Sequence, residues 1–163
     1  MRSGMMLLEL IAVLALLIVT VSLSLPVFSV FDRFLVRTEL DTLYLTCTAL
    51  QHEAQLTGKA QELRFIVKEH AYAWGDKRHR LHDAVRFGTV PNVAGPPAAP
   101  HAIITHPVTF PGNKIVFYPD GIVQAGAVYL VDKARRFLFA LTCPVSHISY
   151  MRRYAYQARW APL

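Results

Sequence analysis

The chain has 163 residues, a formal net charge of +6 and an apolar fraction of 53%. That length suits one modest domain together with one long hydrophobic helix, and two cysteines without a CxxC pair give no support to a zinc site. No charged residue occurs from Leu10 to Phe31. A run of that length can cross a hydrocarbon layer about 30 Å thick. The sequence therefore predicts a membrane-spanning helix and, after it, a globular domain that carries the positive charge.

The first nine residues, MRSGMMLLE, do not follow the order of a secretory signal peptide. Such a peptide has its small-residue cleavage site after the apolar stretch, whereas Gly4 precedes it. Glu9 lies one helical turn inside the apolar run, where a carboxylate is costly unless it is protonated or paired. Cleavage after Gly4 would create an amine at Met5 that neutralises Glu9 of a neighbouring subunit. The alternative is a plain, uncleaved membrane anchor.

This arrangement resembles the amino termini of type IV pilins and type II secretion pseudopilins. The resemblance implies that a prepilin peptidase cuts between Gly4 and Met5 and methylates the new amine, and that Glu9 sets the register of assembly. Pro26 falls where the family commonly has a helix-kinking proline, and a proline removes one backbone donor from a helix. The partners implied are major and minor pilins or pseudopilins, the prepilin peptidase, an assembly ATPase, an inner-membrane platform protein and membrane lipid.

The predicted fold class is α+β and pilin-like, with a long amino-terminal helix packed on a small antiparallel β-sheet head. The helix is expected over 5–57, with its first half spanning the membrane and Gly58 as its stop. Apolar residues at helical spacing predict the face that meets the head: Val36, Leu40, Leu43, Tyr44, Cys47, Leu50 and Ala54. A second apolar set on another face either meets neighbouring helices or is buried in the same domain as the first: Phe31, Leu35, Leu45, Ala49 and Leu56.

Three regions follow from this interpretation. Residues 1–4 form a leader peptide, and residues 5–31 form the transmembrane and filament-core helix. Residues 32–163 contain the rest of the helix and a β-rich head. The resemblance places the chain as a single-pass protein of the inner membrane, with its head in the periplasm or outside the cell.

The head is predicted to be rich in strands. Strands are expected over 62–68, 71–74, 113–118, 125–132, 135–143 and 147–154, the last four as an antiparallel meander. Asp120 and Gly121 are predicted to form the turn after the first strand of this meander.

Other parts of the head are predicted to be irregular. A charged loop is expected over 76–83, with His79 and His82 as solvated residues rather than metal ligands. The proline-rich stretch 91–111 is expected to be an extended, poorly ordered connection. Residues 110–152 resemble the GspH/FimT type of minor pseudopilin.

The leading functional hypothesis is a structural subunit of a type II secretion pseudopilus or a related type IV filament that serves protein export. No catalytic motif, cofactor site or metal site is found in the sequence, so no catalytic residue is proposed and the chain is not expected to be an enzyme.

The alternative hypothesis is a minor type IV pilin that binds DNA during natural transformation. Arg152, Arg153 and Arg159 alternate with aromatic residues in the carboxy-terminal tail, a composition that suits phosphate contact and base stacking. The competing interpretation of the tail is a basic strand on a solvated surface.

The two cysteines also leave two possibilities open. Cys47 and Cys143 are either buried thiols or a disulfide, which an oxidising compartment outside the membrane would permit.

Overall fold

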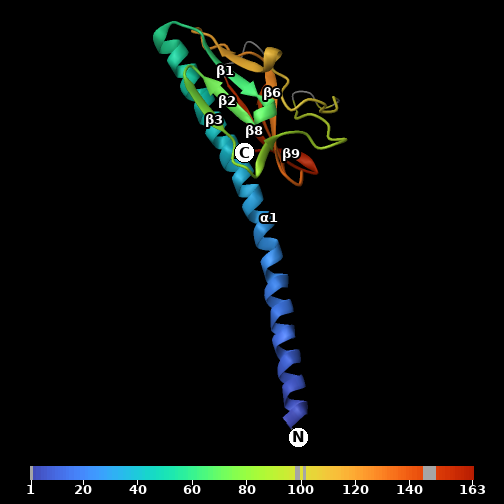
Figure 1. Ribbon diagram of the computed structural model, residues 1–163. Coiled ribbons are helices and arrows are strands. Elements are labelled where there is room, and N and C mark those ends of the chain that lie inside the picture. Colours follow the sequence, from blue (N-terminus) through green and yellow to red (C-terminus); the bar gives the residue numbers. More distant parts are fainter. Residues whose placement is uncertain (1, 98–99, 101, 145–149) are drawn as a thin grey trace.

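The computed structural model describes residues 2–97, 100, 102–144 and 150–163, with the side chains of all of these except residues 2–8 and 21–30. Helix α1 (Arg2–Thr57) projects from the head at its amino-terminal half and lies along the head at its carboxy-terminal half (Figure 1). Gly58 follows with φ of +66°, in the left-handed region where a glycine ends a helix without strain. The helix therefore stops at the glycine that the sequence indicated.

The head contains two antiparallel sheets. Sheet A has the strand order β3-β2-β1-β5, and sheet B has the order β4-β6-β7-β8-β9. Two short 3-10 helices, η1 (Val67–Glu69) and η2 (Pro111–Asn113), interrupt the connections. The strands are β1 (Gln61–Ile66), β2 (Ala71–Trp74), β3 (Lys77–Arg80), β4 (Val85–Phe87), β5 (Lys114–Phe117), β6 (Gly126–Asp132), β7 (Leu138–Cys143), β8 (Arg152–Gln157) and β9 (Arg159–Pro162).

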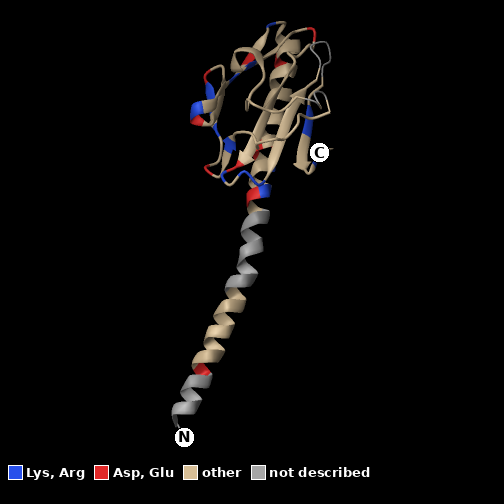
Figure 2. Ribbon diagram, turned by 90° about the vertical axis from the view of Figure 1, so that its right-hand side faces the viewer, with Lys and Arg blue, Asp and Glu red and all other residues tan. Residues whose placement is uncertain are grey.

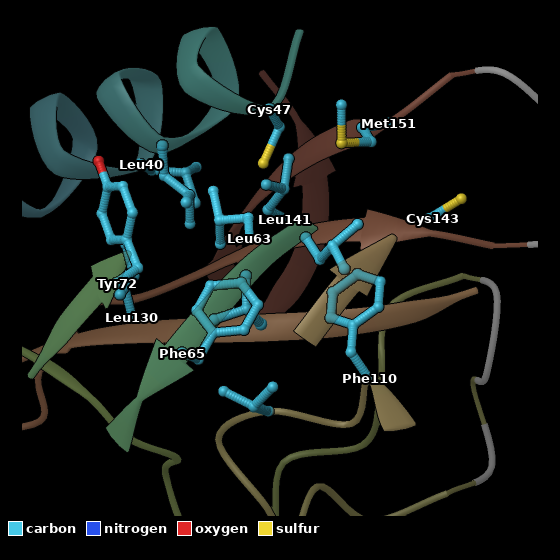
Figure 3. Close-up of a cluster of buried hydrophobic side chains, with 14 of the residues drawn as sticks. Leu40, Cys47, Leu63, Phe65, Tyr72, Phe110, Leu130, Leu141, Cys143 and Met151 are labelled. Atoms are coloured by element: carbon cyan, nitrogen blue, oxygen red, sulfur yellow. The ribbon is translucent and has the colours of Figure 1, made fainter. Parts of the chain in front are cut away.

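One hydrophobic core lies between α1 and both sheets (Figure 3). From the helix it takes Val36, Leu40, Leu43, Cys47, Leu50 and Ala54, all of them buried. These are the residues predicted for the inner face, apart from Tyr44, which is half-buried. On the sheet side, the ring of Phe65 stacks on Phe110 with centroids 6.1 Å apart and meets Phe87 edge-on at 5.6 Å. The inner face of α1 thus holds the two sheets together.

Sheet B is buried on its other face as well. Every residue of β7 and nearly every residue of β6 is buried, which requires a cover on both sides. The cover on the outer face comes from the stretch that follows β4, whose residues Val93 and Ile104 pack on Tyr129 and Ala140. The amide nitrogen of Ile104 donates to the carbonyl of Val93 at 3.1 Å, so this stretch forms its own backbone pairing.

The expectation of a poorly ordered proline-rich connection is therefore wrong for the described part of 91–111. The indole Nε1 of Trp160, on β9, donates to the carbonyl of Ala94 at 2.8 Å and fixes the cover to the edge of sheet B. The apolar residues of the proline-rich stretch are needed to cover the outer face of sheet B. This long-range packing outweighs the local preference of a proline-rich sequence for an extended, unpacked chain.

The predicted fold class is wrong in two respects. The head is not one small sheet, because β5 pairs with β1 in sheet A while β6, β7 and β8 pair in sheet B, which divides the predicted meander. Within the described residues, no helix combines the length and the apolar character needed to cross a membrane. The predicted membrane-spanning first half is thus not supported.

The predicted charged loop over 76–83 is also wrong, because β3 pairs with β2 there, with His79 opposite Tyr72. His79 is only half-buried, but its Nε2 has a protein partner, lying 2.9 Å from Oε2 of Glu39 on α1. The other oxygen of Glu39 accepts the backbone N–H of His82 at 2.9 Å. This strand was missed because it has charged residues rather than an alternating pattern, which is common for the edge of a sheet.

His70 connects the two sheets and makes their junction sensitive to pH. Its Nδ1 accepts the backbone N–H of Phe87 at 3.3 Å, which requires an unprotonated nitrogen. Burial, followed by the nearby charges of Arg86 and Arg80, lowers the pKa of His70 below its ordinary value of 6.5. A histidine with a lowered pKa in the folded state contributes its stability fully above the unfolded pKa, and this contribution is lost as the pH falls from there through the lower pKa of the folded state.

We therefore expect the free energy of unfolding to decrease between about pH 7.5 and about pH 5.5, more steeply in the wild type than in His70→Gln. Urea denaturation at several pH values measures both slopes. Equal slopes in the two proteins would contradict this assignment to His70.

Candidate functional site

The candidate site is the part of α1 that projects from the head. In the segment from Glu9 to Thr20, hereafter the projecting segment, the large apolar side chains are 50–67% exposed. They are Leu10, Ile11, Val13, Leu14, Leu16, Leu17, Ile18 and Val19. Among the side chains that the structure describes on α1, the first one buried by the head is Val36. The head therefore leaves the projecting segment uncovered.

The projecting segment is apolar on all its sides. Successive residues of an α-helix are rotated by about 100°, so eight apolar residues among ten consecutive positions leave no polar face. Figure 2 shows the same contrast: charged residues gather on the head, and the described part of the projecting helix beyond Glu9 is tan. A helix that is apolar all round is found where other apolar groups surround it. This segment therefore has the properties of a helix that is buried in an assembly.

Glu9 lies at the start of the projecting segment and is exposed. Gly4 and Met5, the residues expected to flank the cleavage, belong to α1, but their side chains lie outside the described ones. The same holds for Pro26, and the backbone of α1 remains helical through this position. Cleavage, methylation and the kink all stay predictions.

A second uncovered apolar surface runs along the part of α1 that lies on the head. Phe31, Phe34, Leu45 and Leu56, hereafter the outer stripe, are 57–86% exposed. Phe34, Leu45 and Leu56 are 11 residues apart, which is about three helical turns, so they lie on one side of the helix. Of the second apolar set predicted from the sequence, Leu35 instead packs against the core.

Charged side chains fix the direction in which α1 leaves the head. Arg153 Nη1 donates to Asp41 Oδ1 at 2.6 Å, and its guanidinium lies 4.5 Å from the ring centre of Tyr44. Lower on the helix, Arg136 bridges Asp32 of α1 and Asp132 of β6. Because these pairs join the helix to sheet B, the projecting segment has a defined orientation relative to the head.

The residues predicted to contact DNA do not form one surface. Arg152 and Arg153 are adjacent on β8, and successive side chains of a strand point to opposite faces. Arg153 is occupied by Asp41, while Arg152 is exposed and lies 4.8 Å from the ring centre of Tyr150. Arg159 is exposed on the neighbouring strand β9.

The aromatic residues of this tail pack against one another within the head. Trp160 packs on Tyr156, with ring centroids 5.2 Å apart, and on Tyr154 at 6.4 Å. Tyr154 is itself buried. Neither the guanidinium of Arg153 nor the ring of Tyr154 is therefore available to a nucleic acid.

Asp120 and Gly121 form a turn in the structure. Asp120 Oδ1 accepts the backbone N–H of Ile122 at 3.0 Å, and Gly121 has φ of +85°. The carbonyl of Gly121 accepts the side-chain N–H of Gln51 at 3.0 Å, so the turn is attached to α1. These residues thus have a structural role.

Cys47 and Cys143 are both buried thiols and are not joined by a disulfide. Figure 3 shows Cys47 on α1 with its side chain facing the sheets. Cys143 lies at the end of β7, and its side chain points away from Cys47. Burial raises the pKa of the Cys47 thiol far above its ordinary value, so this thiol is protonated and unreactive.

Comparison of the chain with protein-family models, with curated proteins and with solved structures finds no match. In the part of the chain that the structure describes, no three His, Cys, Asp or Glu side chains gather in a way that would hold a metal ion. Function is therefore argued from the exposed surfaces of α1 and from the sequence pattern at its amino terminus.

Proposed function

We propose that the chain is a structural subunit that assembles through α1 into a pilin-like filament, as a minor pseudopilin of a protein-export system or as a related minor pilin. The projecting segment carries this proposal, because its apolar side chains are exposed on every side of the helix. The resemblance of the Gly4, Glu9 and Pro26 pattern to type IV pilins supports it independently.

Other copies of the same helix are suitable occupants of this surface. Full burial of one leucine, isoleucine or valine side chain contributes roughly 1.5–3 kcal/mol, and association costs about 4–15 kcal/mol in lost freedom of motion. Several side chains buried between neighbouring helices offset that cost. In our proposal the outer stripe is a second part of the lateral interface, closer to the head.

Glu9 gives this assembly its register. A carboxylate among packed apolar helices needs a positive partner. In our proposal the partner is the amine of Met5 in an adjacent subunit, created by cleavage after Gly4. The heads then lie outside the bundle of helices, in the periplasm or beyond it, as the resemblance implies.

The test is cross-linking of the full chain in bacterial cells, followed by separation of monomers from multimers. We expect the double variant Leu14→Glu, Leu17→Glu to lose nearly all multimers, because two charges would be buried without partners at the interface. Ile103→Glu is the matched control, since Ile103 is 61% exposed on the head and lies away from α1.

The control should keep the wild-type level of multimers. Multimers that persist in the Leu14, Leu17 double variant, or that disappear equally in the Ile103 control, would overturn assembly through the projecting segment.

A further inference from the structure

A polar cleft lies where the two sheets meet, on the side of the head that carries β3 and β4. Its volume is about 390 Å³. It is lined by the end of η1 with His70, by the end of β3 and the loop that follows it, and by β4 and the β6–β7 turn of sheet B. Three cations line it: Arg80, Arg86 and Lys133. Two histidines, His70 and His82, and two acids, Glu69 and Asp83, complete its polar lining.

The charges in this cleft do not cancel. Glu69 is paired with Arg78, which lies outside the lining, and Asp83 lies 3.7 Å from Arg80. Among the residues that the structure describes, no carboxylate pairs with Arg86 or Lys133. The cleft therefore has an excess of positive charge supplied by one strand and one turn of sheet B.

His70 adds a hydrogen-bond donor to these cations. Because its Nδ1 accepts the N–H of Phe87, the neutral ring carries its proton on Nε2. Arg86 and Arg80 line the same cleft as His70. Burial, followed by the charges of these two arginines, lowers the pKa of His70. His82 is in the same tautomeric state, since its Nδ1 accepts the N–H of Ala84 at 3.1 Å, but its side chain is the more exposed of the two.

We propose that this cleft binds a tetrahedral oxyanion, either inorganic phosphate or a phosphate monoester, through Arg86, Lys133 and the Nε2–H of His70. A guanidinium and an ammonium are the usual partners of phosphate oxygens, and charge-assisted hydrogen bonds to them are strong. Donors from three positions suit a tetrahedral anion better than a planar carboxylate, which one arginine would satisfy. This site is independent of the assembly proposed for α1.

Binding has a measurable effect on His70. A bound anion favours the protonated ring, so the pKa of His70 should rise when the site fills. The change is opposite to the effect of Arg86 and Arg80 in the empty cleft. A rise in the pKa of His70 on addition of the anion therefore indicates binding in this cleft, because a histidine outside the cleft would show no such change.

The test is a titration of the full chain, kept monodisperse in a mild detergent, with inorganic phosphate and separately with O-phosphoserine. His70 is followed by the NMR signals of its ring. We expect a saturable change and a raised pKa of His70 with at least one of the two probes. Tighter binding of O-phosphoserine identifies a monoester as the ligand, and equal or weaker binding identifies free phosphate.

The double variant Arg86→Gln, Lys133→Gln should weaken binding by about tenfold or more. Both side chains are exposed, so their replacement leaves the core intact. The matched control is Arg152→Gln, Arg159→Gln, which removes the same charge from the far end of sheet B and should leave the affinity unchanged. No saturable change at His70, or an equal loss in both double variants, would refute the proposal.

Discussion

Replacing Asp132 with alanine is expected to lower the free energy of unfolding by about 3 kcal/mol. Asp132 is only 1% exposed at the end of β6. Its Oδ1 accepts the backbone N–H groups of Arg136 and Phe137 at 2.7 and 2.8 Å, and its Oδ2 lies 3.3 Å from Nε of Arg136. The carboxylate thus shapes the β6–β7 turn and holds the arginine that reaches α1, and alanine leaves all of these donors without their acceptor.

Urea denaturation of the full chain measures this loss as a shift of the midpoint at an unchanged slope. The matched control is Asp32→Ala, which removes the other, more exposed carboxylate that contacts Arg136. We expect it to cost less than about 1 kcal/mol, because partly solvated ion pairs contribute little. If the two variants were equally stable, the turn would not depend on the Asp132 carboxylate.

Truncation of Leu43 to alanine is expected to cost about 3 kcal/mol, within the usual range of about 2–5 kcal/mol for a buried leucine. Leu43 is 0% exposed on the inner face of α1 and belongs to the core shared by both sheets. The cavity left by its side chain lies between a helix and two sheets that are fixed by many other contacts. The surroundings therefore have little freedom to close it.

Leu45→Ala is the matched control for this variant. It removes the same atoms two residues further along the same helix, but Leu45 is 65% exposed on the outer stripe. We expect its free energy of unfolding to differ from that of the wild type by less than about 0.5 kcal/mol. Comparable losses in Leu43→Ala and Leu45→Ala would show that the outer stripe is covered within the isolated chain.

The helix was the part of the fold most open to prediction. Its inner face repeats apolar residues at the period of an α-helix from Val36 to Ala54, and Gly58 marks its end. Both signals are local, so the pattern alone locates the residues that pack on the head. The sequence separated Leu45 and Leu56 from the inner face but left open whether they are buried in the domain, and the structure shows both exposed.

The arrangement of the strands was less accessible, because it depends on contacts between distant residues. Nothing local to β5 indicates that Ile115 pairs with Leu63 of β1 rather than with the strand that follows it. The unbroken apolar runs of β6 and β7 are consistent with their burial on both faces, which was not predicted from the sequence. The residues that cover the outer face come from a proline-rich stretch whose composition indicates disorder.

The two candidate sites also differ in whether a local sequence pattern or contacts between distant residues define them. The pattern of Gly4 and Glu9 is visible in nine consecutive residues, so a site at the amino terminus could be proposed from sequence alone. The cleft between the sheets joins Arg86 to His70 and Lys133, which are 16 and 47 residues away, and only the paired sheets bring them together. The basic tail was misleading, because alternation along β8 separates residues that are neighbours in the sequence.

The way in which α1 lies across the head has a mechanical consequence. The helix contacts β1, β4, β5, β6 and β7, and its buried residues extend from Val36 to Ala54, a length of about 27 Å along the axis. Tension applied along the projecting end therefore acts parallel to this interface. It loads the contacts together, in shear, whereas a sideways pull would peel them apart one turn at a time. A head attached in this way resists axial pulling far better than bending.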